Sequence, residues 1–109
     1  MQLPELPFKI PRKGLLIEAT GEKFPFTIVD EIRRPQSWFA AGTGAKILCL
    51  QLLRLDHNGK EELRLGYYII GKKPRMLGKW VWGQFAAMMP IEDFRALMDE
   101  AREKGWLTT

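Results

Sequence analysis

The run KILCLQLLRL at residues 46–55 is the feature that most constrains the fold of this chain. It is almost continuously apolar through Leu53, which is typical of a central strand covered on both faces. The segment DHNGK at residues 56–60 follows directly, and its Asn-Gly pair favours a tight hairpin turn. Residues 61–70 then have the pattern of a return strand. The run therefore predicts the middle of an antiparallel sheet.

Three further strands are expected, at residues 14–19, 24–32 and 79–87. A turn at residues 20–23 separates the first two of them, because Gly21 can take a positive φ. The alternation of the second strand predicts one face made of Phe24, Phe26, Ile28, Asp30 and Ile32. In the expected strand at residues 79–87, Trp80 and Trp82 fall on one face and Val81 on the other.

One helix is expected after Pro90, whose missing N–H is harmless in a first helical turn. Gly105 is placed to end it in a Schellman motif, with Trp106 folded back on Ala101. The predicted buried stripe of this helix is Ile91, Phe94, Leu97, Met98 and Ala101. The connections between strands are mostly too short for crossovers. The element order therefore predicts an α+β fold, in which one C-terminal helix packs on one face of an antiparallel sheet of four to five strands.

Residues 1–13 form a separate part of the predicted organisation. They contain Pro4, Pro7 and Pro11, and this spacing favours an extended arm over a helix. Residues 14–109 are expected to form a single α+β domain. The apolar side chains of the arm can pack it onto the body of that domain.

Composition narrows the functional classes. The 109 residues are 46% apolar and suit one core, and the net charge of +4 permits binding to nucleic acid without requiring it. Cys49 is the single cysteine and is expected to be a small buried apolar residue, which fits a reducing cytoplasm. No apolar run approaches the roughly 20 residues that span a bilayer, so no membrane partner is expected. We expect a cytoplasmic protein.

No catalytic or cofactor-binding signature is present. His57 is the only histidine and lies in the hairpin turn, where solvent exposure is expected. Residues 42–46 are rich in glycine but lack the spacing and the Ser or Thr of a phosphate-binding P-loop. A metal-dependent nuclease remains a third alternative; its acidic cluster would combine Asp30, Glu31, Glu61 and Glu62 with Lys60. We otherwise expect a non-enzymatic domain without a cofactor.

The segment RLGYYIIGKKPRMLGKWVW at residues 64–82 is the only local signal toward a function. It carries five basic residues, no acidic one, and four interleaved tyrosines and tryptophans. Cations attract phosphates, and aromatic faces stack on unpaired bases. Trp38, preceded by Arg33 and Arg34, repeats this basic-then-aromatic order within the irregular segment at residues 33–45.

The meaning of these aromatics depends on one face of the sheet. If the helix covers the face of Val81, then Trp80, Trp82 and Tyr68 lie on the opposite face. Should that face be open, it is suited to a single strand, whose splayed bases can stack. The alternative is that the arm or a second subunit covers it, which would indicate a protein–protein interaction or oligomerisation module.

The layout of residues 46–104 resembles the positive-cofactor-four and Whirly families of single-stranded-DNA-binding transcriptional regulators. The resemblance lies in a strand, the turn at residues 56–60, a strand ending in Tyr67-Tyr68, a basic turn bounded by glycines, a further strand, and a helix opening Pro90-Ile91-Glu92. It implies a homodimer with helices at its interface and curved sheets that bind single strands.

The leading hypothesis is a small domain that binds single-stranded DNA or RNA. The predicted phosphate contacts are Lys72, Lys73, Arg75 and Lys79, and the predicted stacking residues are Tyr68, Trp80 and Trp82. Further candidate contacts are Arg64, Arg33, Arg34 and Trp38. A homo-oligomer is also expected.

Overall fold

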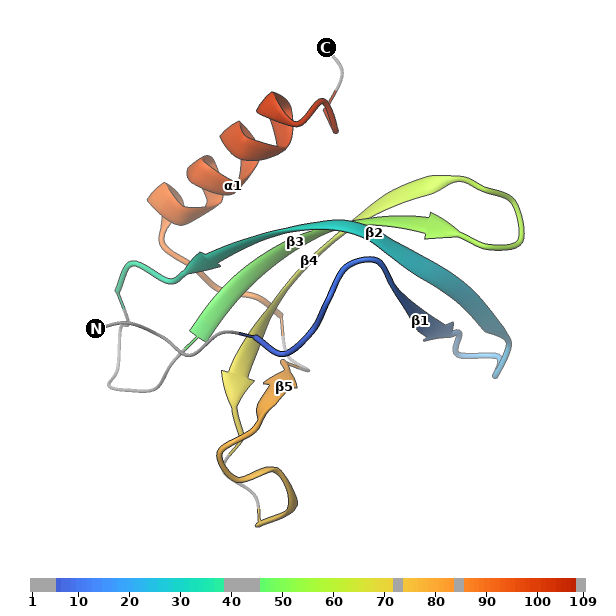
Figure 1. The fold of residues 1–109 in the computed structure, drawn as a ribbon, viewed down its shortest axis with the longest axis horizontal. Coiled ribbons are helices and arrows are strands. Elements are labelled where there is room, and N and C mark those ends of the chain that lie inside the picture. Colours follow the sequence, from blue (N-terminus) through green and yellow to red (C-terminus); the bar gives the residue numbers. More distant parts are fainter. Residues whose placement is uncertain (1–5, 39–45, 72–73, 84–85, 108–109) are drawn as a thin grey trace.

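The computed structural model describes residues 6–38, 46–71, 74–83 and 86–107. These residues form a curved antiparallel sheet and one α-helix on one side of it (Figure 1), which confirms the predicted α+β class. The strand order in the sheet is β1-β2-β3-β4-β5, so consecutive strands are neighbours. The elements are β1 (Arg12–Ile17), β2 (Lys23–Pro35), β3 (Lys46–Leu55), β4 (Glu61–Ile70), the 3-10 turn η1 (Pro74–Met76), β5 (Trp80–Trp82) and α1 (Ile91–Glu103).

The central hairpin has the predicted boundaries. Strands β3 and β4 pair from Lys46 opposite Ile69 to Arg54 opposite Glu61. Gly59 closes their turn at a φ of 71°, a conformation that side chains with a Cβ disfavour. Neighbouring residues Leu48 and Cys49 point to opposite faces and are both fully buried, so β3 is covered on both sides as predicted.

A β-bulge in β2 overturns the prediction of a single apolar face for that strand. Ile28 pairs with Leu53 but Asp30 pairs with Leu52, so Val29 is an extra residue between them. Side chains alternate between faces along a strand, and one added residue reverses that alternation. Phe26 and Ile28 consequently lie on one face of the sheet and Ile32 on the other.

Helix α1 packs through a narrower stripe than expected. Asp93, Leu97 and Ala101 are its buried residues, whereas Ile91 is 78% exposed and Phe94 is 46% exposed. The C-terminal motif is confirmed, since Gly105 has a φ of 79° and the Trp106 amide donates to the Ala101 carbonyl at 3.0 Å. The predicted stripe is thus wrong at its N-terminal end.

Three strands have other boundaries than expected. Strand β1 covers Arg12–Ile17, against an expected strand at residues 14–19. Strand β2 continues through Pro35, which pairs with Ile47, so the irregular segment begins later than Arg33. Strand β5 covers only Trp80–Trp82, against an expected strand at residues 79–87. Residues 84–85 lie outside the described part of the chain. The hairpin partner β3 supplies ladder bonds that extend β2, whereas β5 is an edge strand with one neighbour.

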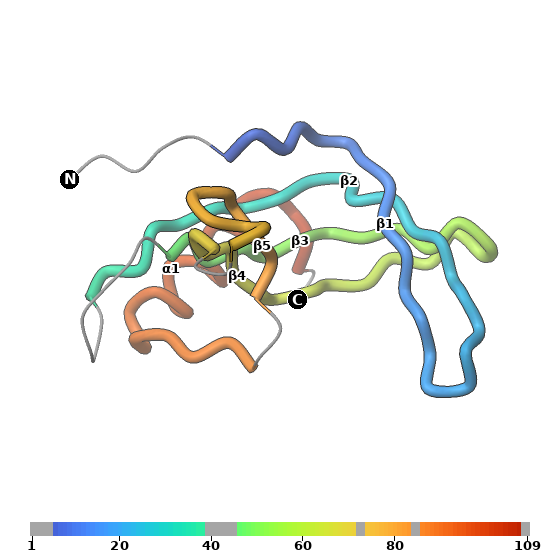
Figure 2. The backbone as a smooth tube through the Cα atoms, turned by 90° about the horizontal axis from the view of Figure 1, so that it is seen from below, coloured from blue at the N-terminus to red at the C-terminus, as the bar shows by residue number. Residues whose placement is uncertain are grey.

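The sheet has a differently built cover on each face. We call the surface under α1 the helix face; its buried residues are Ile32, Leu48, Leu50 and Tyr67 together with Leu97 and Ala101 of the helix. We call the opposite surface the arm face, because residues 6–11 run along it on the side away from α1 (Figures 1 and 2). None of the helices formed by the described residues is long and apolar enough to cross a membrane.

Candidate nucleic-acid interface

The arm face brings basic and aromatic side chains together from four strands and the arm. It contains Glu31 and Arg33 of β2, Ile47, Cys49 and Gln51 of β3, Arg64, Gly66 and Tyr68 of β4, and Trp80 and Trp82 of β5. Tyr68, Trp80, Trp82 and Arg64 thus share a face opposite the helix, as the alternation predicts.

Glu31 is the centre of a hydrogen-bonded network on this face. Its side chain is 1% exposed, and its carboxylate accepts hydrogen bonds from Arg12 Nη2, Arg33 Nε and Gln51 Nε2. Arg12 Nη2 also donates to the Tyr68 hydroxyl. A buried carboxylate needs such partners, because removing it from water without them is costly.

Arg64 lies between two aromatic rings. Its guanidinium carbon is 4.6 Å from the centre of the Trp82 ring and 5.0 Å from that of Phe26, and its Nε donates to Gln51 Oε1 at 2.8 Å. Burial lowers the pKa of this guanidinium from its ordinary value. Gly66 makes the arrangement possible, since a Cβ there would collide with the Trp82 ring.

The arm covers part of the predicted stacking surface. The Phe8 ring stacks on Tyr68 with 5.1 Å between ring centres and 26° between planes, and Tyr68 is only 4% exposed. Leu6 and Phe8 pack against Ile47 and Cys49 in the same cluster. Of the two alternatives for this face, the arm covers Tyr68, while Trp80 and Trp82 remain half-buried.

The basic connection between β4 and β5 extends from one end of this face. Arg75 and Lys79 are exposed, whereas the predicted contacts Lys72 and Lys73 lie outside the described residues. Hydrogen bonds from the Gly71 amide to the Lys79 carbonyl at 2.8 Å and from the Gly78 amide to the Gly71 carbonyl at 3.2 Å close the loop. This connection therefore carries two exposed cations next to the edge strand β5.

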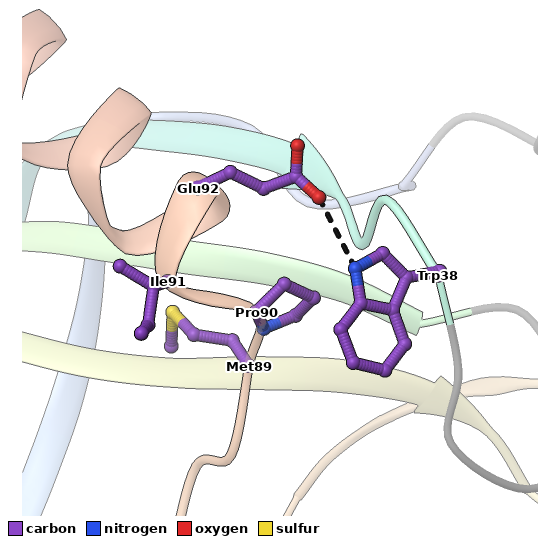
Figure 3. Close-up of a pocket in the computed structure, with 5 residues that line it drawn as sticks. All are labelled: Trp38, Met89, Pro90, Ile91 and Glu92. Carbon is purple, nitrogen blue, oxygen red and sulfur yellow. Dashed lines mark hydrogen bonds between the residues drawn. The ribbon is translucent and has the colours of Figure 1, made fainter.

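The second predicted basic-aromatic patch divides between the two faces. Arg33 is on the arm face, but Arg34 points to the helix side, where its Nε donates to Asp93 Oδ1 at 2.6 Å. Adjacent strand residues point to opposite faces, so Arg33 and Arg34 cannot act on one surface. Trp38 also lies at the helix, and its Nε1 donates to Glu92 Oε1 at 3.1 Å (Figure 3).

Asp93 joins the end of β2 to the start of α1. Fully buried, its carboxylate accepts hydrogen bonds from Arg34 Nε, the Ser37 amide and the Ser37 hydroxyl. Burial alone would raise the pKa of this carboxyl, but the bonds from Ser37 and Arg34 outweigh it and hold that pKa below its ordinary value. The sequence shows Asp93 only as a first-turn acidic residue.

Trp38 lines an apolar pocket of about 410 Å³ with Met89, Pro90, Ile91 and Glu92 (Figure 3). A second hollow of about 630 Å³ lies at the other end of the helix. It is bordered by Val29, Asp30, Leu52, Glu61, Glu62, Leu63, Lys104, Gly105 and Trp106. Sequence reasoning identified neither hollow, because each is made by segments distant in the chain.

The acidic cluster of the nuclease alternative is divided between the two faces of the sheet, because Asp30 and Glu31 are adjacent in β2 and point to opposite sides. Asp30 is on the helix side, where Lys104 Nζ lies 3.3 Å from its Oδ2, while Glu31 is occupied on the arm face. Within residues 6–38, 46–71, 74–83 and 86–107, no group of three His, Cys, Asp or Glu side chains is placed to hold a metal ion. His57 is exposed in its turn, as expected.

Cys49 is buried beneath the arm, as predicted for a small apolar residue. Burial, followed by the nearby Glu31 carboxylate, raises the pKa of its thiol. The raised pKa disfavours the thiolate, which is the nucleophilic form of cysteine.

Sequence reasoning missed Arg12, Glu31 and Gln51 as members of the site. The one available signal is Gln51, a polar residue within the apolar run of β3, because a buried amide needs hydrogen-bond partners nearby. Arg12 could not be assigned, since its approach to Tyr68 depends on the path of the arm.

Comparison of this chain with protein-family models, curated proteins and solved structures finds no match. The resemblance to the positive-cofactor-four and Whirly families therefore stays a prediction, and the function is argued from the site itself.

Proposed function

We propose that this protein binds single-stranded nucleic acid along the arm face and the adjoining β4–β5 connection. One observation carries the proposal: three arginines, Arg12, Arg33 and Arg64, share this face with a single buried glutamate, and two of them, Arg12 and Arg64, lie over aromatic rings. Excess positive charge beside aromatic faces suits a ligand with phosphates and planar bases.

The charge balance supports an anionic ligand. Glu31 offsets one of the three guanidiniums, which leaves an excess of two positive charges in the cluster. Arg64 has no ion-pair partner among the residues described, and Arg12 Nη1 is buried without a hydrogen-bond partner there. Partly desolvated cations are costly, and a bound phosphate would offset that cost.

The shape of the site supports a single strand over a duplex. Trp80 and Trp82 are half-buried on the edge strand β5, next to exposed Arg75 and Lys79. A duplex keeps its bases stacked inside and presents mainly phosphates to a sheet. A single strand can place bases on these rings, with roughly 1–3 kcal/mol for each stacked base.

Fluorescence anisotropy of labelled oligothymidine and oligouridine tests this proposal at low and moderate salt. We expect binding that weakens with salt, and Lys79→Ala should reduce the slope of log K against log salt by about 0.7 for the lost phosphate contact. Lys60→Ala is the matched control, because Lys60 precedes the opposite end of β4. An equal effect of both substitutions, or no binding at low salt, would contradict the proposal.

A second candidate function, homodimerisation, is favoured by the helix side of the sheet. Leu63, Leu65 and Ile69 of β4 are partly exposed there, as are Ile91 and Phe94 of α1. Several exposed apolar side chains on one side of a molecule are typical of protein interfaces. Light scattering should then report a dimer that Phe94→Ser weakens; a monomer at high concentration would contradict this second function.

A further inference from the structure

The described arm, residues 6–11, is held on the sheet by side chains. Pairing of β1 with β2 begins at Arg12, and no backbone–backbone hydrogen bond joins residues 6–11 to any other described residue. Its contacts are apolar packing by Leu6, Phe8 and Ile10, together with a hydrogen bond from Arg33 Nη2 to the Phe8 carbonyl oxygen at 2.7 Å. Such a segment can leave the sheet without breaking a strand ladder.

Phe8 presents to this face the two kinds of group that a nucleotide would present. Its flat ring lies on Tyr68 at 5.1 Å between centres, as a base lies on an aromatic side chain. Its carbonyl oxygen accepts from the Arg33 guanidinium, as a phosphate oxygen would. The guanidinium carbon of Arg12 is 5.3 Å from the centre of the Phe8 ring, so a second arginine lies next to Phe8.

From this geometry we infer that Tyr68, Arg33 and Arg12 form a subsite for one nucleotide, and that Phe8 fills it when no nucleic acid is bound. The inference rests on the proposed function and adds to it an internal competitor. A nucleotide would place its base on Tyr68 and its phosphate on Arg33 and Arg12. Only the form in which the arm has left the sheet can bind a nucleotide there. The measured affinity is therefore the affinity of that form multiplied by its fraction of the population.

The variant Phe8→Ala tests this subsite in the chain of 109 residues. Ile17→Ala is the matched control, because it also truncates an apolar residue of the N-terminal segment, but an exposed one outside the arm-face cluster. The first readout needs no nucleic acid. Cys49 belongs to the buried cluster against which Leu6 and Phe8 pack, so Phe8→Ala should raise its rate of alkylation by a maleimide several-fold, and Ile17→Ala should not.

The second readout is the affinity for oligothymidine. Phe8→Ala should bind roughly 5- to 10-fold more tightly than the unmodified protein, which corresponds to loss of one aromatic stack from the closed form. Should Phe8→Ala fail to fold, Phe8→Leu keeps apolar contact and removes the flat ring, with the same expected directions.

The outcomes separate the two proposals. Unchanged Cys49 alkylation, or unmodified protein that binds as tightly as Phe8→Ala or more so, overturns the subsite and leaves the proposed function standing. Absence of oligonucleotide binding by both proteins at low salt overturns the proposed function and the subsite together. Faster alkylation with tighter binding supports both.

Discussion

The helix face and the arm face belong to the same sheet, but their covers are held in different ways. Helix α1 ends in a Schellman motif and buries Leu97 and Ala101 in the largest apolar cluster. The arm makes no described backbone ladder before Arg12 and lies over charged groups. One cover is therefore part of the architecture, while the other lies over the surface for which we propose a ligand.

The largest effect is expected where the helix cover is damaged. Leu97→Ala should lower the free energy of unfolding by about 3 kcal/mol, because it leaves a cavity in the cluster with Leu48 and Tyr67. Urea denaturation followed by circular dichroism measures this change. A loss below about 1 kcal/mol would mean that the helix is as loosely held as the arm.

A smaller effect is expected from crowding the arm face. In Gly66→Ala the new methyl group would meet the Trp82 ring, and overpacking of this kind costs about 1–3 kcal/mol. The displaced indole should also leave Arg64, so near-ultraviolet circular dichroism of the tryptophans should change. An unaltered spectrum with full stability would show that Trp82 does not lie on Gly66.

The hydrogen bonds of Asp93, which join the end of β2 to α1, make the free energy of unfolding depend on pH. The folded-state pKa of Asp93 is lowered, so its contribution is complete above the unfolded pKa of about 3.9 and is lost as pH falls through the folded value. Asp93→Asn should cost about 1–3 kcal/mol at neutral pH and flatten the decline of stability in acid. Denaturation curves between roughly pH 2 and pH 6 measure both changes. Equal acid sensitivity in the variant would contradict this role.

The smallest loss of stability is expected on the arm. Phe8→Ala should cost about 1 kcal/mol, the worth of an aromatic pair, because Phe8 is half-buried and no strand depends on it. The urea series used for Leu97→Ala measures it under the same conditions. A loss as large as that of Leu97→Ala would make the arm a structural element and remove the contrast between the two covers.

Most of the fold could be predicted from local pattern, and the site only in part. The apolar run of β3, the Asn58-Gly59 turn and the Gly105 motif are local signals, and each gives an element of the predicted kind. The bulge at Val29 could not be predicted, because it depends on how β2 aligns with β3 across the sheet.

The site depends on that same cross-strand alignment. Alternation alone was enough to place Tyr68, Trp80 and Trp82 on one face. The pairing of Arg12 with Glu31 and the stacking of Phe8 on Tyr68 join residues far apart in sequence, and no local pattern encodes them. Arg33 and Arg34 point to opposite faces because they are adjacent residues of a strand. That could be predicted only by extending the strand to Pro35, which the local pattern does not do.

The exchange of Phe8 for a nucleotide is tested most directly by nuclear Overhauser effects at the Tyr68 ring. In the free protein, the Tyr68 ring protons should show contacts to the Phe8 ring, whose centre lies 5.1 Å away. At saturation with oligothymidine, we predict that these contacts disappear and that contacts from Tyr68 to thymine protons replace them. Persistence of the Phe8–Tyr68 contacts in the saturated complex would contradict the account.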